Sequence, residues 1–238
     1  MVFLTHHSGL VKYQMPQGNA RGGRYNFTDS SYDGFTKNHF LSAGLGTLTD
    51  GKLAPKDYAT AGGSGWIGWN TKDTPTPYII FEFLNTRIFR SMTLHCNVRD
   101  RTKIKLFSKV VVSFSEDGGS FDASRTYEPE SVSSGSSWMN YNVTIDLCQH
   151  IGKLMKLNFT YAGHWILISE VTFDSGKFTV FVLKRLEQHR RWATAILAFF
   201  EFLGKRKVYL LSLYCMLNVF CIQSLVRYGQ IVKILINN

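Results

Sequence analysis

Cysteine and proline are scarce in this sequence, and their scarcity excludes several classes of protein. The 238 residues include four cysteines and five prolines. Four cysteines are too few for the dense disulfide framework of a small secreted scaffold. Cys96 and Cys148 are also too far apart for the paired spacing of a zinc site. Because proline and glycine are scattered and 45% of the residues are hydrophobic, the chain is globular rather than disordered.

A strong charge of one sign is missing from the first three quarters of the chain. The net charge is +10. Residues 177–238 contain ten of the 27 Lys and Arg residues and two of the 17 acidic residues, so this tail carries +8. Residues 1–176 carry 17 basic and 15 acidic residues, a net charge of +2. A nearly neutral body does not show the footprint of a nucleic-acid-binding domain, so we expect no nucleic-acid partner.

Catalytic motifs are absent as well. None of the seven histidines has the His-Glu-x-x-His spacing or lies beside a nucleophile elbow. His95, next to Cys96, is interpreted as an outward-facing surface residue, and His164 as a turn residue. The segment Gly62–Gly65 lacks the Lys-Ser/Thr of a phosphate loop, and no His-Arg-Asp or Asp-Phe-Gly kinase string is present. We therefore expect no enzyme, and a hydrolase with an ancillary jelly roll is the least favoured alternative.

The N-terminal residues lack the apolar run of a secretory signal peptide. If the domain is extracellular, its true N-terminus is missing, and residues 1–8 are interpreted as an N-terminal remnant. Three glycosylation sequons, at Asn26, Asn142 and Asn158, fit a secreted domain. An unused sequon is the equal alternative at each of the three.

Short runs of alternating or continuous apolar residues indicate β-strands. They occur at 78–83, 92–96, 110–114, 143–147, 155–161 and 166–173. An alternation with a period of two is typical of a half-buried strand. Many such strands with turn signals between them predict an all-β sandwich or barrel.

Two polar stretches predict loops. Residues 1–65 are rich in Gly, Asn, Asp and Ser and predict loops with short strands. Residues 116–140, which begin with a turn, are rich in Ser and Gly and predict an exposed loop. Of the four tryptophans in this part of the chain, three are expected to be buried anchors rather than a binding surface: Trp66, Trp69, Trp138 and Trp165.

An ordered series of short strings carries a resemblance to a known family. The strings are Gly9–Tyr13, Asp29–Gly34, Gly44–Gly51, Phe81–Phe83, Met92–Asn97, Ala162–Trp165 and Ser169–Phe173. Over about residues 8–175 they resemble the second, discoidin-like domain of the discoidin domain receptors, which are collagen-binding receptor tyrosine kinases. The resemblance implies an all-β domain at residues 9–176, an eight-stranded jelly-roll barrel or sandwich of the coagulation factor V/VIII C-type class.

The same resemblance implies a structural calcium site. Its positions fall at Thr28, Thr47, Asp50, the backbone of Lys52, the neighbourhood of Ser64 and Trp66, Ser169 and Glu170. Calcium takes six to eight oxygen ligands. The two carboxylates match the family pattern, whereas both threonines stand where longer amides are usual and the loop before the tryptophan is short. The alternative is that Asp50 merely begins a turn and Glu170 is a solvated strand residue.

The resemblance also places a cysteine at Cys96, with a partner expected near Leu157, where this sequence has none. Cys148 lies nine residues before that position. Either Cys148 pairs with Cys96 in a shifted geometry, or Cys96 is a buried free thiol.

The basic and apolar tail, residues 177–238, has three interpretations. Residues 208–226 carry no charge and are just long enough to span a bilayer, but the basic segment before them would place the β domain in the cytosol. The tail could instead form amphipathic helices that lie on the domain or on a membrane surface. The third and favoured interpretation is a translated retained intron, because the codons for residues 176–178 can contain a splice-donor-like GTAAA.

The resemblance implies the function. The implied function is that of a non-catalytic module of a collagen-activated receptor tyrosine kinase, at the extracellular face of the plasma membrane. In such a parent receptor, collagen is contacted by a preceding domain, and this module would space, orient and dimerise the ectodomain. The alternative is a free-standing adhesive module that binds glycans or anionic lipid through its loop tips.

Overall fold

The computed structural model describes residues 9–135 and 137–178. Residues 1–8, which are interpreted as an N-terminal remnant, lie outside the described residues. Residues 179–238, which include the uncharged segment 208–226, also lie outside them. Within the described ranges, no helix is long and apolar enough to cross a membrane.

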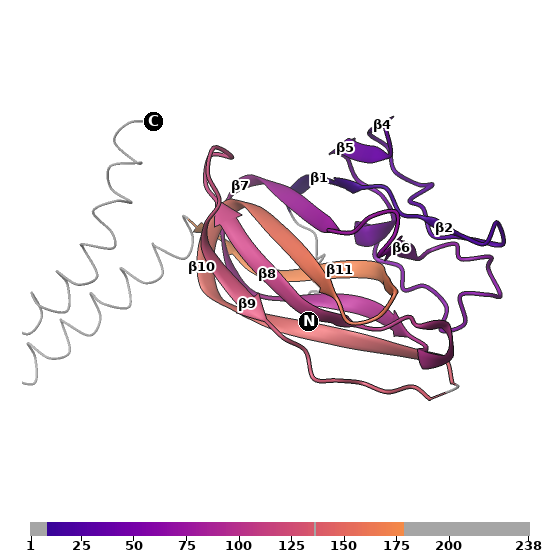
Figure 1. Cartoon of the computed structure of the whole chain (residues 1–238). Helices are drawn as coiled ribbons and strands as arrows, with labels where there is room; N and C mark the ends of the chain where they lie inside the picture. Colours follow the sequence, from indigo (N-terminus) through magenta and orange to yellow (C-terminus); the bar gives the residue numbers. More distant parts are fainter. Residues whose placement is uncertain (1–8, 136, 179–238) are drawn as a thin grey trace, which may run out of the picture. The chain divides into compact units, whose positions relative to one another are not determined.

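Eleven β-strands and two short 3₁₀ helices make up the described part of the chain (Figure 1). The first group is β1 (Leu10–Pro16), β2 (Ala20–Arg21), β3 (Tyr25–Asn26), β4 (Phe35–Lys37), β5 (Phe40–Gly44), η1 (Thr47–Thr49) and β6 (Ile67–Asn70). The second group is β7 (Tyr78–Val98), η2 (Asp100–Thr102), β8 (Phe107–Ser115), β9 (Asp122–Tyr127), β10 (Met139–Tyr161) and β11 (Trp165–Lys177).

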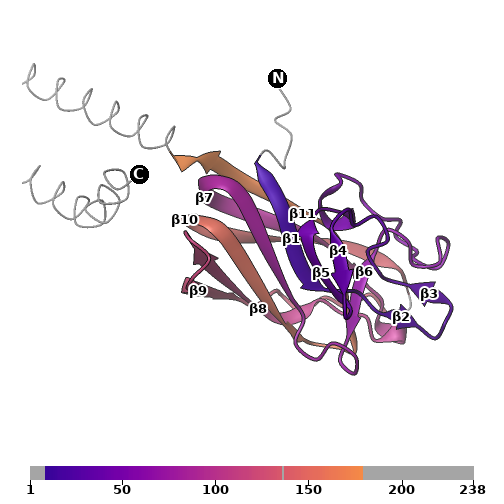
Figure 2. The same ribbon diagram turned by 90° about the horizontal axis from the view of Figure 1, so that it is seen from above.

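One curved antiparallel sheet contains all of these strands except the β2–β3 hairpin. Its order is β4-β5-β1-β7-β10-β8-β9, and β11 pairs with both β6 and β7. The long strands run beside one another, while the short strands β2–β6 gather at one end of the domain (Figures 1 and 2). Strand β7 is the centre of this arrangement because β1, β10 and β11 all pair with it.

The inward side chains of the curved sheet meet in one hydrophobic core. Along β7, Ile79, Phe81 and Phe83 are buried and alternate with more exposed residues, as the period of two requires. Phe173 on β11 packs edge-on against Phe81, with ring centroids 5.0 Å apart, and against Phe83 at 5.3 Å. The predicted all-β jelly-roll fold is confirmed.

Two of the long strands each combine two runs that the sequence analysis treated as separate strands. Strand β7 unites residues 78–83 with 92–96, and β10 unites 143–147 with 155–161. The second strand stays continuous by means of a β-bulge. Cys148 and Gln149 have φ angles of 50° and 57°, and the Cys148 amide donates to Asp146 Oδ1 over 2.7 Å. The bulge accommodates the polar residues that interrupt the apolar pattern.

The prediction of a loop throughout residues 116–140 is wrong in one part. Strand β9 (Asp122–Tyr127) pairs antiparallel with β8 inside that stretch. It is the last strand of the sheet order, so it needs hydrogen bonds on one side only. Its polar sequence therefore lacks the apolar alternation by which internal strands are recognised.

The predicted pairing of Cys96 with Cys148 is also wrong. Both residues are free cysteines, and Cys96 is buried whereas Cys148 is exposed. In the sheet Cys96 lies opposite Tyr141, seven residues along β10 from Cys148. At about 3.3 Å per strand residue the separation is roughly 20 Å, far beyond the reach of a disulfide. The alternative of a buried thiol agrees with the structure, and burial raises the pKa of Cys96 to about 12.

A second, smaller hydrophobic cluster is separate from the main core. It consists of Phe27, Ala54, Tyr58, Trp66, Ile104, Trp165 and Leu167. These residues come from the end of β3, the loop between η1 and β6, the segment between η2 and β8, and the strand β11, so the cluster packs these loop segments against the barrel wall. Trp66, Trp69 and Trp165 are buried and Trp138 is half-buried, which confirms the expectation for three of the four tryptophans.

Candidate metal site

The turn after η1 carries the first of the two predicted carboxylates. Asp50 ends this 3₁₀ helix, and its Oδ1 accepts the amide of Lys52 over 2.9 Å. Gly51 between them has a φ of 77°, which a residue with a Cβ rarely adopts. The turn therefore holds the Asp50 side chain beside the chain that follows it.

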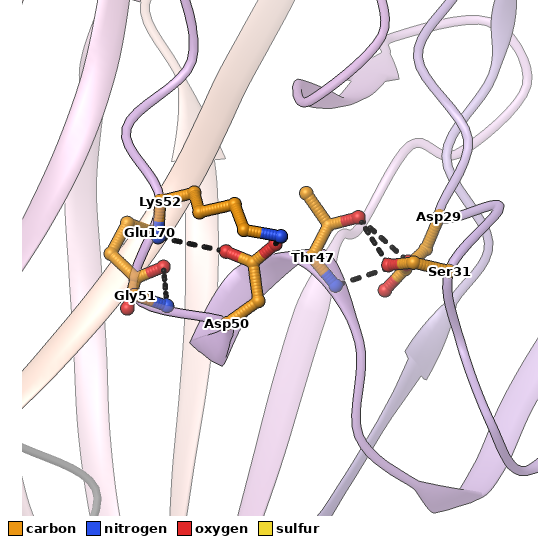
Figure 3. A network of polar contacts seen from close by, with 7 residues as sticks. All are labelled: Asp29, Ser31, Thr47, Asp50, Gly51, Lys52 and Glu170. Carbon is orange, nitrogen blue, oxygen red and sulfur yellow. Dashed lines mark hydrogen bonds and ion pairs between the residues drawn. The ribbon is translucent and has the colours of Figure 1, made fainter.

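The second carboxylate reaches the same turn from β11. Glu170 is only 2% exposed, and its Oε2 accepts the amide of Gly51 over 3.2 Å. Figure 3 shows the side chains of Asp50 and Glu170 on either side of this turn. The structure thus brings together two carboxylates that are 120 positions apart in the sequence. The alternative interpretation of Glu170 as a solvated strand residue is wrong, whereas Asp50 does lie in a turn.

Ser169 and His95 connect the loop after this turn to the sheet. The Ser169 hydroxyl accepts the Ala54 amide over 3.4 Å and lies 2.5 Å from His95 Nδ1. The interpretation of His95 as a surface residue is wrong. Its side chain faces away from the main core, but Trp66 covers it, with stacked rings 5.3 Å apart. Burial lowers the pKa of His95, so the imidazole stays neutral at pH 7.

Thr47 does not join the two carboxylates. Its hydroxyl donates to Asp29 Oδ1 over 2.9 Å and its amide donates to the same oxygen over 3.2 Å. Ser31 Oγ lies 3.1 Å from Asp29 Oδ1 and 2.8 Å from Thr47 Oγ1. Figure 3 shows Thr47 turned toward Asp29 and away from Glu170. Thr47 therefore belongs to a neighbouring polar network.

Asp29 is the centre of that network, and the sequence analysis missed it as a structural residue. The hydroxyl of Tyr13 donates to Asp29 Oδ2 inside the barrel. Burial first, and then the charge of Asp29, raise the pKa of Tyr13, so the phenol stays protonated and remains a donor. A Cβ at Gly46 would lie 2.6–2.8 Å from the two carboxylate oxygens of Asp29 and the hydroxyl of Tyr13, so only glycine fits there. The one available signal was the string Asp29–Gly34, which carried part of the family resemblance.

The other predicted ligand positions lie apart from the carboxylate pair. Ser64 is exposed in a turn and its amide donates to Ala61 O over 3.0 Å. The Trp66 indole nitrogen donates to Pro55 O over 3.0 Å. Within the described ranges, neither Ser64 nor the half-buried Thr28 is hydrogen-bonded to Asp50. The segment Gly62–Gly65 is a turn, as predicted.

The three sequon asparagines differ in exposure. Asn26 and Asn142 are exposed, and Asn158 is half-buried on β10, where it alternates with the buried Leu157 and Phe159. All three side chains therefore lie outside the main core. Their modification stays a prediction.

The pair Asp50 and Glu170 supplies hard oxygen donors, which suit calcium. Across the described residues, no group of three or more His, Cys, Asp and Glu side chains converges. A cation at this turn would therefore take its remaining ligands from backbone carbonyls, hydroxyls and water. Lys52 Nζ lies 3.7 Å from Asp50 Oδ2 and would compete with such a cation. The carboxylate pair fits a weak calcium site, whereas the hydroxyls of Thr47 and Ser64 do not contribute to it.

Comparison with known proteins identifies the domain. The family model for the discoidin-like (DS-like) domain of discoidin domain-containing receptors 1 and 2 matches residues 9–175. The chain belongs to the discoidin domain receptor family. The matched part, residues 9–175, is the discoidin-like domain of that family.

Curated relatives of this discoidin domain receptor chain bear the family name. Mouse epithelial discoidin domain-containing receptor 1 is 29% identical over 183 residues, which cover 70% of this chain and 20% of the relative. The Caenorhabditis elegans discoidin domain-containing receptor tyrosine kinase B is 31% identical over 180 residues, which cover 73% of this chain and 22% of the relative. The chain thus spans about a fifth of the length of these relatives. A Streptococcus pneumoniae fucose-binding module aligns with a TM-score of 0.44 and 12% identity over 70% of this chain and 95% of its own, and a likeness at that level supports no inference.

Proposed function

We propose that this domain is a non-catalytic extracellular module of a collagen-activated receptor tyrosine kinase. It would set the spacing and orientation of the ectodomain, and support its homodimer, at the outer face of the plasma membrane. In this proposal collagen binds to a preceding domain of the parent receptor. The observation that carries the proposal is the family match over residues 9–175, which spans the barrel except for the last two residues of β11.

The exposed sequons support the extracellular placement. Asn26 and Asn142 present their side chains to solvent, as a glycan acceptor requires. Cys148 is exposed, has no disulfide partner among the described residues and lies 2.7 Å from an Arg125 nitrogen.

A domain exchange tests this function. We expect a mouse receptor whose own discoidin-like domain is replaced by residues 9–177 to show collagen-induced tyrosine phosphorylation, because the module supplies geometry rather than the collagen contact. Phosphorylation would be measured on cells with and without collagen, and a receptor with the domain deleted would serve as the control. A chimera that reaches the surface and binds collagen, but signals no more than the deletion, would contradict the proposal.

We also propose that the turn at Asp50 and Glu170 binds a calcium ion. Two carboxylates at a turn, one of them buried, would gain from a divalent cation that offsets their mutual repulsion. A bound ion would connect the turn to β11 and so hold the loop between η1 and β6 against the sheet. Because few side-chain ligands are present, the affinity should lie in the range of about 10⁻⁴–10⁻³ M that is typical of extracellular modules.

Thermal unfolding tests the calcium site. At about 5 mM calcium, an affinity in that range stabilises the folded state by about 1–2 kcal/mol, which raises the melting temperature by a few degrees. Asp50→Asn keeps an acceptor for the Lys52 amide but removes the charge, and should abolish the increase. Asp117→Asn is the matched control, because Asp117 also accepts an amide two residues ahead, over 2.8 Å. An equal calcium response in both variants would place the ion elsewhere.

A further inference from the structure

Four cations lie within seven residues around the helix η2. The segment reads Arg99-Asp-Arg-Thr-Lys-Ile-Lys105. Lys103 takes a left-handed conformation with a φ of 57°, and its amide donates to Asp100 O over 2.9 Å. This tight turn leaves the side chains of Arg101 and Lys103 exposed. The local geometry thus concentrates positive charge on one turn of the barrel rim.

The β2–β3 hairpin adds two arginines to this turn. An Arg21 nitrogen donates to the Thr102 carbonyl over 3.0 Å, so β2 lies against η2. The amide of Arg24 donates to the Arg21 carbonyl over 3.2 Å, which places Arg24 on the same hairpin turn. Together these cations form a surface that we name the basic face: Arg21, Arg24, Arg99, Arg101, Lys103 and Lys105.

Aromatic rings hold three of these guanidinium groups in place. Arg99 lies over the Trp138 ring at 3.5 Å, Arg21 over Trp165 at 5.7 Å and Arg24 over Tyr25 at 5.3 Å. Stacking on a ring orients a guanidinium without neutralising it. Because these arginines are already oriented, they lose less conformational entropy when they bind an anion.

Acidic groups do not neutralise the basic face. Among the described ion pairs, only Lys105 has an acidic partner on this face, with its Nζ 3.5 Å from Asp100 Oδ1. The other oxygen of Asp100 accepts bonds from the loop at residues 133–135. Glu128 and Glu130 precede that loop on its exposed side. Five of the six cations of the face therefore have no acidic partner among the described ion pairs, although the body of the chain is nearly neutral.

The cationic groups of the basic face favour the binding of a hydrophilic polyanion. Guanidinium groups bind tetrahedral oxyanions through paired charge-assisted hydrogen bonds. Membrane binding would also need exposed apolar side chains that insert into lipid. The exposed large apolar residues of the described part are Val11, Phe35, Leu53, Leu84 and Tyr141, and none falls in the β2–β3 hairpin or in residues 99–105, the two segments that carry the basic face. We propose that the basic face binds a sulfated polysaccharide, independently of collagen and of calcium.

Binding of the full chain to immobilised heparin tests this proposal. At about 0.15 M salt we expect Arg24→Glu and Arg101→Glu each to weaken binding at least tenfold. Lys37→Glu, on the edge strand β4 away from η2, should change binding less than twofold. The basic tail is the same in all three variants, so a difference between them arises from the substituted positions and not from the tail. Hyaluronan, which has carboxylates but no sulfates, should bind much more weakly.

Lysine acetylation followed by mass spectrometry locates the contact on the unmodified protein, whatever the stability of the variants. Heparin should protect Lys103 from acetylation and leave Lys37 unprotected. The proposal is overturned if both arginine variants bind like the parent chain, if Lys37→Glu is equally weakened, or if Lys103 is not protected. Binding to phosphatidylserine vesicles without binding to heparin would also overturn it and would assign the face to a membrane.

Discussion

Replacing Asp29 by alanine is expected to lower the free energy of unfolding by about 3–5 kcal/mol, the largest effect of any polar substitution in the barrel. Asp29 is 4% exposed and accepts bonds from Tyr13, Ser31 and Thr47. Alanine would leave the buried Tyr13 hydroxyl and the buried Thr47 amide without an acceptor, so each would carry its full desolvation penalty, whereas the exposed Ser31 can bond to water instead.

Urea denaturation followed by tryptophan fluorescence measures this loss. Asp33→Ala is the matched control, because Asp33 is exposed and accepts the single amide of Leu45 over 2.6 Å. It should cost about 1 kcal/mol. If the two substitutions destabilise the domain equally, the network around Asp29 does not have the structural role assigned to it.

Trp66→Ala is the second substitution with a large expected effect, again about 3–5 kcal/mol. The Trp66 side chain is fully buried between the loop and the ring of His95, and its indole donates to Pro55 O. Removing it opens a cavity beneath the loop that follows the candidate calcium turn. We therefore expect loss of the calcium response together with loss of stability.

Trp66→Phe separates packing from hydrogen bonding at this position. Phenylalanine keeps a stacked ring and loses the bond to Pro55, so its cost should be about 1–2 kcal/mol. Limited proteolysis should cut the loop between η1 and β6 rapidly in the alanine variant and slowly in the phenylalanine variant. Equal cleavage in all three proteins would show that this tryptophan does not fasten the loop.

The strands that carry a strict apolar alternation could be predicted from the sequence, because the pattern records which side of each strand meets the core. The positions at which the strands bend could not be predicted in this way. The bulge at Cys148 and Gln149 depends on two left-handed residues, which no local motif announces. Strand β9 was missed because an edge strand needs no apolar periodicity.

The candidate site was predictable only in part, and for a related reason. Asp50 and Glu170 were found through a family pattern, since nothing local relates residues so far apart in the chain. Thr47 was placed in the wrong network because Asp29 competes for its hydroxyl, and that competition exists only once the barrel has closed. His95 was misjudged because alternation shows which face of a sheet a side chain occupies, but not whether a loop later covers that face.

The pairing of β7 has a mechanical consequence. Strand β1 begins at Leu10 opposite Phe83, and β11 ends at Lys177 opposite Arg87. The polypeptide therefore enters and leaves the barrel wall at nearly the same point, with β11 and β1 almost collinear along one edge of β7. Tension applied between these two points would pass through about 10–15 Å of a single strand and would bypass the hydrophobic core. Most of the domain would lie to one side of the line of force. A pulling force would therefore rotate the domain without unfolding it.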